Sequence, residues 1–352
     1  MKRVQSSGSF RPWGFFIFVI RYEIRHILAG LLCCVMVWGA SVSSALAADD
    51  SLMKRRQQGI LTGMPFMANL APRTFIDDMG RKLFLAKHPT RIISLAPSIT
   101  EILFAIGLNE EIVGVTEFCD YPPQAKDKTV VGYAQPNIES IVALKPDLVL
   151  APKSFMRADL LRKLEQLKIP TFILEPHTVE EIMAHIKLLG RMVGRSDAAN
   201  EQTTSLRKQI AQLSDQLKGR ARPSLLYILN SEPLITVGPG SFIHHLIELA
   251  GGRNAAEAAT TPYPRLTMEE VLRQNPDILL FPVGRFEGIP QAEQDRWKRW
   301  ETLTAVKKNY LFQVQSDLLN RPGPRIIEGL KQLVRFLHPE VLQNETMNQR
   351  DD

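Results

Sequence analysis

The chain has 352 residues, of which 45% are hydrophobic and 23% charged, and its formal net charge is +6 at pH 7. This length exceeds the roughly 250 to 300 residues at which a single hydrophobic core stops growing, so we expect two domains. Removal of a basic N-terminal leader lowers the net charge to about +2, so the basic surplus does not indicate a nucleic-acid partner.

Residues 1–47 are typical of an export signal. Basic residues precede an apolar run at 27–40, and the small-residue sequence Ala-Leu-Ala follows at 45–47. We expect cleavage after Ala47 and an exported mature chain that begins with a polar linker at 48–73. An earlier apolar block at 13–20 leaves retention of an uncleaved anchor open, although neither block reaches the ~20 apolar residues of a spanning helix.

The three cysteines give little support for disulfide or lipid chemistry. Cys33 and Cys34 lie in the leader, and the preceding Leu32 argues against lipid attachment because a lipoprotein signal requires a small residue there. Only Cys119 remains after cleavage, so we expect no internal disulfide.

An internal repeat organises the chain. The stretch NIESIVALKPDLVL at 137–150 returns as TMEEVLRQNPDILL at 267–280, and Glu139 and Glu269 coincide at an offset of 130 residues. Each copy reads as a short helix, a Pro-Asp break and a buried strand, which is a unit of an α/β sheet. Two copies predict two similar α/β lobes, whereas a solenoid needs three or more repeats.

The first lobe is predicted at 74–195. A helix at 97–106 begins with Pro-Ser-Ile-Thr-Glu, which matches the S-x-x-E capping box, so we expect Ser98 and Glu101 to cap it. No G-x-S-x-G elbow supports Ser98 as a nucleophile. The other predicted elements are a hairpin at 74–76 and 82–85, strands at 91–95, 112–115, 148–150 and 171–174, and helices at 158–167 and 179–192.

One long amphipathic helix is predicted at 196–219. Leu206, Ile210, Leu213 and Leu217 recur at helical spacing between Ser196, a good N-cap, and Gly219, a good stop. Its length of about 33 Å spans two lobes. A rigid connecting helix predicts limited opening between the lobes.

The second lobe is predicted at 220–340, followed by a tail at 341–352. The turn at 238–241 reads as a tight turn with Ser241 as N-cap, because it lacks the Lys-Ser/Thr of a phosphate loop. Trp297 and Trp300 read as one packing face of a helix. The other predicted elements are strands at 225–229, 234–237, 278–281 and 311–314, helices at 242–250 and 325–337, and a loop at 316–324.

No residue set has the spacing of a metal or catalytic site. His244 and His245 point about 100° apart on a helix, and the H-E-x-x-H pattern is absent near Glu248. His177 and His185 read as surface or packing residues. Since no paired carboxylates or nucleophile set stands out, we expect neither a catalytic residue, nor a metal site, nor a cofactor.

A groove between the lobes is the predicted binding site. Aromatic and polar residues that converge on such a groove suit a large, partly apolar ligand with polar edges. The carboxylates of Glu139 and Glu269 either stabilise their helices by about 0.3 to 1 kcal/mol or dock on basic sockets of a two-fold partner. The residues expected at the groove are Phe118, Tyr121, Tyr133, Phe242, Tyr263, Asp317 and Arg321.

Five ordered motifs carry a family resemblance: RIISLAPSITEILFAIG, DYPPQA, NIESIVALKPDLVLAP, GPGSFIHHLIELAGGRN and SDLLNRPGPRIIEGL. They resemble the helical-backbone periplasmic binding proteins of ABC importers, most closely the cobalamin-binding members. The resemblance implies two α/β lobes joined by a long helix, with cobalamin, a ferric siderophore or haem held between them. It implies that the partner is a dimeric membrane permease and that Glu139 and Glu269 are the carboxylates that dock on it.

By position, the resemblance implies ligand contacts at Phe118, Tyr133 and Tyr263 and along Asp317, Leu318, Leu319, Asn320 and Arg321. A monomeric receptor for cobalamin or another corrinoid is the leading expectation. Haem or a ferric siderophore is the first alternative. The chain departs from the cobalamin binders, which favour Tyr and Trp where it has Phe118, Tyr133 and Tyr263, and which often carry a disulfide in the second lobe that this chain cannot form. An exported metal-dependent hydrolase or chelatase-like enzyme is the second alternative.

Overall fold

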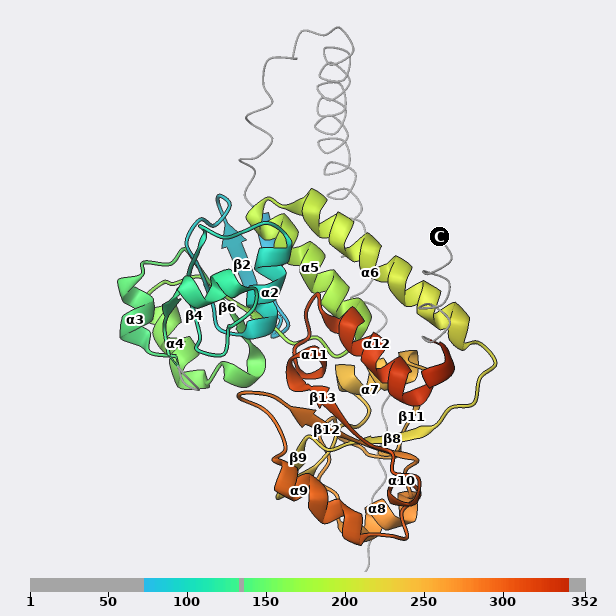
Figure 1. Ribbon diagram of the computed structural model, residues 1–352. Helices are drawn as coiled ribbons and strands as arrows, with labels where there is room; N and C mark the ends of the chain where they lie inside the picture. Colours follow the sequence, from blue (N-terminus) through green and yellow to red (C-terminus); the bar gives the residue numbers. More distant parts are fainter. Residues whose placement is uncertain (1–72, 133–135, 342–352) are drawn as a thin grey trace, which may run out of the picture. The chain divides into compact units, whose positions relative to one another are not determined.

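The computed structural model describes residues 73–132 and 136–341, which belong to one compact unit (Figure 1). The predicted leader, most of the linker, Tyr133 and the tail after Val341 lie outside the described residues. Within the described ranges, no helix is both long enough and apolar enough to cross a membrane.

An antiparallel hairpin opens the described chain, as predicted. It consists of β1 (Arg73–Ile76) and β2 (Lys82–Leu85), with Phe75 and Leu85 buried in the core. The turn is closed by Asp77, whose carboxylate accepts hydrogen bonds from the amides of Met79 and Arg81 at 3.0 and 2.9 Å.

A five-stranded parallel sheet in the order β5-β4-β3-β6-β7 follows. Buried apolar side chains pack on both of its faces, which explains why its strands read as continuous hydrophobic runs. Its strands are β3 (Ile92–Ser94), β4 (Ile112–Val115), β5 (Thr129–Val130), β6 (Leu148–Pro152) and β7 (Thr171–Leu174); its helices are α2 (Pro97–Ala105), α3 (Ile138–Ala143), α4 (Ala158–Gln166) and α5 (Val179–Val193), with 3-10 turns η1 (Pro123–Asp127) and η2 (Lys153–Phe155).

The second sheet is parallel and four-stranded, in the order β11-β8-β12-β13. We call the parts built on the two sheets the N-terminal and the C-terminal lobe. The strands of the second are β8 (Ser224–Tyr227), β11 (Arg253–Asn254), β12 (Ile278–Val283) and β13 (Leu311–Gln315), with a short hairpin of β9 (Asn230–Ser231) and β10 (Leu234–Ile235); its helices are α7 (Phe242–Leu249), α8 (Met268–Gln274), α9 (Gln291–Asp295), η3 (Arg296–Arg299), α10 (Thr304–Lys307), α11 (Ser316–Asn320) and α12 (Ile326–Leu337).

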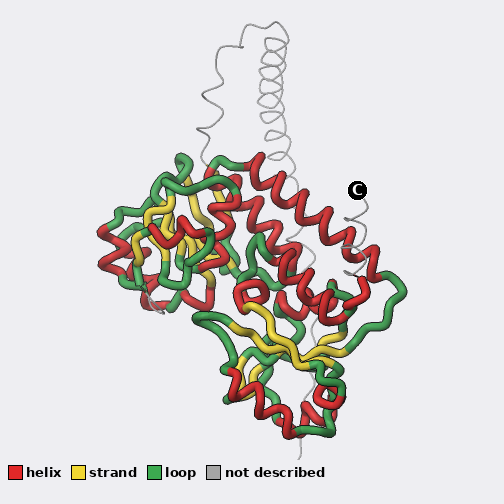
Figure 2. Tube along the Cα trace, viewed as in Figure 1, coloured by secondary structure: helices red, strands yellow, loops and turns green. Residues whose placement is uncertain are grey.

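The predicted long helix is present as α6 (Ser196–Leu217), and it carries the described chain once from the first sheet to the second. Figure 2 shows it running alongside α5. Leu206, Leu213 and Leu217 form its buried face, as the spacing predicted. The predicted N-cap is wrong by one residue, since Arg195 holds that position and makes no side-chain cap.

The C-terminal lobe differs from the predicted one at residues 316–324 and agrees with it at Trp297. The predicted loop at 316–324 contains the short helix α11, because Leu319 is fully buried and holds one helical turn against the core. Trp297 packs on Phe281 with ring centroids 6.1 Å apart, so the predicted packing role is confirmed.

The Pro-Asp break of the repeat ties each sheet together. Asp147 accepts hydrogen bonds from the amides of Thr90 and Arg91, both at 2.9 Å, just before β3. Asp277 accepts from the amide and hydroxyl of Ser224 at 2.9 and 2.8 Å, at the start of β8. Each carboxylate therefore joins the start of its own strand to the start of the neighbouring one.

Candidate functional site

Glu101 lies on α2 with its side chain only 1% exposed. The predicted capping box is wrong, because the N-cap is Ala96 and no side chain caps this helix. Pro97 occupies the first turn and has no amide hydrogen that needs an acceptor. The Glu101 carboxylate is therefore available to residues of the other lobe.

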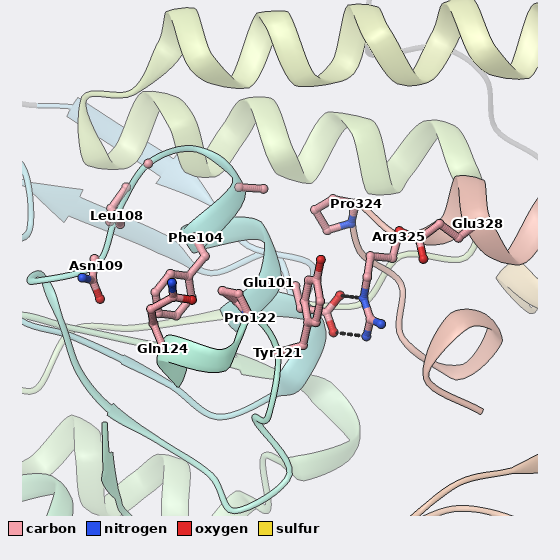
Figure 3. A pocket seen from close by; sticks show the side chains of 12 residues that line it. Glu101, Phe104, Leu108, Asn109, Tyr121, Pro122, Gln124, Pro324, Arg325 and Glu328 are labelled. Atoms are coloured by element: carbon pink, nitrogen blue, oxygen red, sulfur yellow. Dashed lines mark hydrogen bonds and ion pairs between the residues drawn. The ribbon is translucent and has the colours of Figure 1, made fainter. Parts of the chain in front are cut away.

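Two arginines of the C-terminal lobe bind this carboxylate (Figure 3). Arg325 donates from Nε to Oε2 at 2.8 Å and from Nη2 to Oε1 at 2.6 Å, which is a two-pronged pairing. Arg321 donates from Nη1 to Oε1 at 3.1 Å. One buried carboxylate of the N-terminal lobe thus holds two guanidinium groups from the other lobe.

Arg321 has further partners on both lobes. Its guanidinium meets Asp120 and Asp317, each at 2.9 Å, and donates to the Phe118 carbonyl at 3.3 Å. Burial lowers the pKa of Arg321, but the Asp120 hydrogen bond and the Asp317 charge outweigh it, so the net pKa shift is upward. We call Glu101, Asp120, Asp317, Arg321 and Arg325 the interlobe cluster; it carries one more negative than positive charge.

A pocket of about 560 Å³ borders this cluster between α2, the turn at 121–124 and the start of α12 (Figure 3). The Arg325 guanidinium lies 4.1 Å from the centroid of the Tyr121 ring, a cation–π contact. Of the predicted ligand residues that the structure describes, Tyr121 alone lines the pocket. The walls come from Glu101, Phe104, Ala105, Gly107, Leu108, Asn109, Tyr121, Pro122, Gln124, Pro324, Arg325 and Glu328.

The aromatic residues predicted for the groove are only partly brought together. Phe118 makes an edge contact with Phe286 of the other lobe, with centroids 5.1 Å apart. Tyr263 is 53% exposed, and partial burial together with the charge of Glu175 raises its pKa. Glu175 follows β7 of the N-terminal lobe, so the charge that acts on Tyr263 comes from the other lobe.

The structure contradicts the predicted ligand role of two residues, and it places a third, Asn320, in hydrogen bonds within the C-terminal lobe. Phe242 and Leu319 are 6% and 0% exposed and belong to the hydrophobic core, so neither presents a surface to a ligand. Asn320 accepts a hydrogen bond from Tyr227 at 2.8 Å and donates to Glu287 at 2.6 Å. Leu318 is half-buried.

The histidines serve as structural links. The Val179 amide donates to His245 Nδ1 at 3.2 Å, and His177 Nδ1 lies 3.0 Å from the Gly240 carbonyl oxygen, so both join the lobes. His185, predicted to be a surface or packing residue, is buried on α5, and its Nε2 lies 3.0 Å from the Asp78 carboxylate. In the described ranges, no three His, Cys, Asp or Glu residues are grouped as metal ligands would be.

Glu139 and Glu269 occupy matching positions. Each is the second residue of its helix, α3 or α8, and each side chain is exposed. Asn137 caps the first helix, while Thr267 and Glu270 form a capping box at the second. Neither glutamate is used as a cap, so both carboxylates face solvent.

Two parallel sheets joined by one long helix, with polar and aromatic side chains between them, define the class of two-lobed substrate-binding proteins. A family model described as periplasmic binding protein matches residues 92–318. The chain belongs to this family and is the substrate-binding component of an ABC transporter; it is not an enzyme.

Several relatives have named ligands. The chain is 31% identical to the vitamin B12-binding protein of Vibrio cholerae over 70% of its own length and 88% of that protein. It is 31% identical to the cobalamin-binding protein of Halobacterium salinarum, covering 76% of this chain and 74% of that one.

Solved structures are similar as well. The periplasmic vitamin B12 binding protein of Vibrio cholerae gives a TM-score of 0.63 over 71% of this chain and 96% of that chain, at 31% identity. A possible iron-binding periplasmic protein of Staphylococcus epidermidis gives 0.64 over 72% and 100%, at 28% identity. The two-lobed α/β fold is therefore confirmed.

Proposed function

We propose that this protein captures cobalamin or a related corrinoid outside the cytoplasmic membrane and delivers it to the permease of an ABC importer. The observation that carries the proposal is the 31% identity to the vitamin B12-binding protein of Vibrio cholerae over most of both chains. Phe118, Phe286 and Tyr263 add apolar ring surface on both lobes, which suits a large ligand with a flat face. The chain acts as a monomer after cleavage following Ala47.

Calorimetry with the purified mature chain and cyanocobalamin tests the ligand. Binding at micromolar or tighter Kd supports a corrinoid. Phe118→Ala and Tyr263→Ala should each weaken binding about tenfold, since the ring contacts of one aromatic side chain with the ligand contribute roughly 1 to 1.5 kcal/mol. Tyr310→Ala is the matched control, because Tyr310 is 44% exposed but precedes β13, at the opposite end of that strand from Asp317. Absence of heat with cyanocobalamin refutes the corrinoid.

An iron chelate is the second candidate ligand, favoured by the similarity to the possible iron-binding protein of Staphylococcus epidermidis. Haemin and a ferric hydroxamate are therefore titrated in parallel. A shift of the haemin absorbance band, or heat with the hydroxamate alone, replaces the corrinoid proposal with this one.

We assign the proposed contact with the permease to Glu139 and Glu269. Both carboxylates are exposed, and they stand at equivalent positions of the two repeat copies. A pair of acidic residues, one on each lobe, is complementary to a dimeric partner that presents one basic socket from each subunit.

A further inference from the structure

The polar contacts between the lobes are concentrated at two places. One is at His177 and His245, whose rings meet backbone groups of the other lobe, with the exposed Glu180 carboxylate also 3.5 Å from His245. The other is the interlobe cluster, in which Glu101 and Asp120 bind arginines more than 200 residues later in the chain. Of these two places, the cluster joins two arginines to the buried Glu101 carboxylate, so it contributes more to interlobe geometry than an exposed ion pair does.

The two arginines stand in the sequence Arg321-Pro322-Gly323-Pro324-Arg325. Each proline fixes its own φ angle and restricts the residue before it. The backbone path between the two arginines is therefore restricted before their side chains meet Glu101. Both guanidinium groups of this short segment bind the same carboxylate.

Gly323 allows this segment to lie directly on α2. A Cβ atom at this position would come within 3.3 Å of the Ser98 carbonyl oxygen, which is closer than an ordinary contact. The backbone between the arginines therefore rests on the first turn of the helix that carries Glu101. Steric contact and charge pairing fix the same arrangement.

We propose that Glu101 is a positioning residue for ligand capture, which holds Arg321 and Arg325 and thereby fixes the width of the groove between the lobes. Glu101 is fully buried and acts through the arginines without contacting the ligand. Arg321 and its neighbour Asp317 lie where the groove is expected, so a change at Glu101 displaces both. The affinity consequence rests on the proposed function, whereas the interlobe geometry does not.

The test is an interlobe distance measured in ligand-free protein. Spin labels are attached at Ala143→Cys on α3 and Arg273→Cys on α8, which are exposed and equivalent in the repeat, while Cys119 is buried and stays unlabelled. In Glu101→Gln the distance distribution should broaden or shift, and the Kd for cyanocobalamin should rise about tenfold or more. Glu110→Gln is the matched control: Glu110 is exposed just beyond α2 and is not part of the interlobe cluster, so both readouts should stay unchanged.

A purely structural role for Glu101 predicts a lower Tm with an unchanged distance in the folded fraction, and that result overturns the proposal. If Glu101→Gln does not fold, Arg325→Lys replaces it, because lysine keeps the charge but cannot form the two-pronged pairing. A wild-type distance in Arg325→Lys then overturns the proposal. Failure of the unmodified protein to bind cyanocobalamin refutes the corrinoid alone, since the distance measurement needs no ligand.

Discussion

Lys145 and Asn275 adopt the same left-handed backbone conformation, with φ angles of 46° and 45°, at positions 130 residues apart. Each stands immediately before the Pro-Asp pair of its repeat copy. The repeat therefore extends from sequence to backbone geometry. Asparagine tolerates this conformation better than lysine does, so the first copy carries more strain than the second.

Lys145→Gly should raise the free energy of unfolding by about 0.5 to 1 kcal/mol, because glycine adopts a positive φ without steric cost. Urea denaturation measures the change. The control is Lys163→Gly in α4, where glycine should lower stability by about 1 kcal/mol. A Lys145→Gly protein less stable than the wild type would contradict the assigned strain.

Asp277 should make stability depend on acid pH. Burial raises the pKa of its carboxyl, but hydrogen bonds from the Ser224 amide and hydroxyl outweigh it, so the pKa lies below its ordinary value of 3.8. The unfolded chain then binds the proton more readily than the folded protein. This stabilisation is present above the ordinary pKa and is lost as the pH falls through the lowered one.

We therefore expect Asp277→Asn to be less stable than the wild type near pH 7, with a difference that shrinks as the pH falls below the ordinary pKa of 3.8. Urea denaturation across this range measures it. Ser224→Ala removes the hydroxyl partner, and its effect should be non-additive with that of Asp277→Asn. A difference that stays constant with pH is incompatible with the lowered pKa.

Cys119 should be chemically inert in the folded protein. The side chain is 3% exposed, and burial raises the pKa of its thiol despite hydrogen bonds with Thr100 and Thr116. Reaction with Ellman's reagent near pH 8 should be about 100-fold slower than in urea. Cys119→Ala provides the blank, and equal rates in folded and unfolded protein would refute the prediction.

Charge reversal at Glu139 and Glu269, the proposed docking positions, should separate delivery from capture. Glu139→Arg combined with Glu269→Arg should abolish uptake of labelled cobalamin by cells while leaving the Kd for cyanocobalamin unchanged, because like charges would oppose basic sockets. Glu110→Arg with Glu301→Arg is the control, since both residues are exposed and lie outside the repeat. Weakened ligand binding in the first double variant would contradict separate roles for capture and docking.

Local patterns predicted the elements of the fold well. Strand β4 at 112–115 and strand β7 at 171–174 have the predicted bounds. Helix α6 ends at Leu217, two residues before the predicted stop at Gly219. These elements follow from hydrophobic periodicity and from Pro or Gly at their ends, which act over a few residues. The short helix α11 was missed because its single turn depends on core burial of Leu319.

The site was less predictable, because its contacts join distant parts of the chain. Ser98 and Glu101 satisfied a local capping rule, yet Glu101 binds arginines 220 and 224 residues later. An acidic residue in an otherwise apolar stretch of helix, together with two arginines around a Pro-Gly-Pro, is the sequence signal that points to this pairing. Phe242 was expected at the groove as an aromatic residue and Leu319 by the family resemblance, whereas the burial of both follows from packing that the sequence does not display.

The burial of Glu101 should make the contact between the lobes insensitive to ionic strength. Salt screens exposed charges within about 10 Å at 0.1 M, whereas a carboxylate with a side chain 1% exposed is largely shielded from mobile ions. The distance between the lobes should therefore stay the same at low and at high salt concentration. Salt should weaken the proposed docking through the exposed Glu139 and Glu269 long before it alters ligand capture.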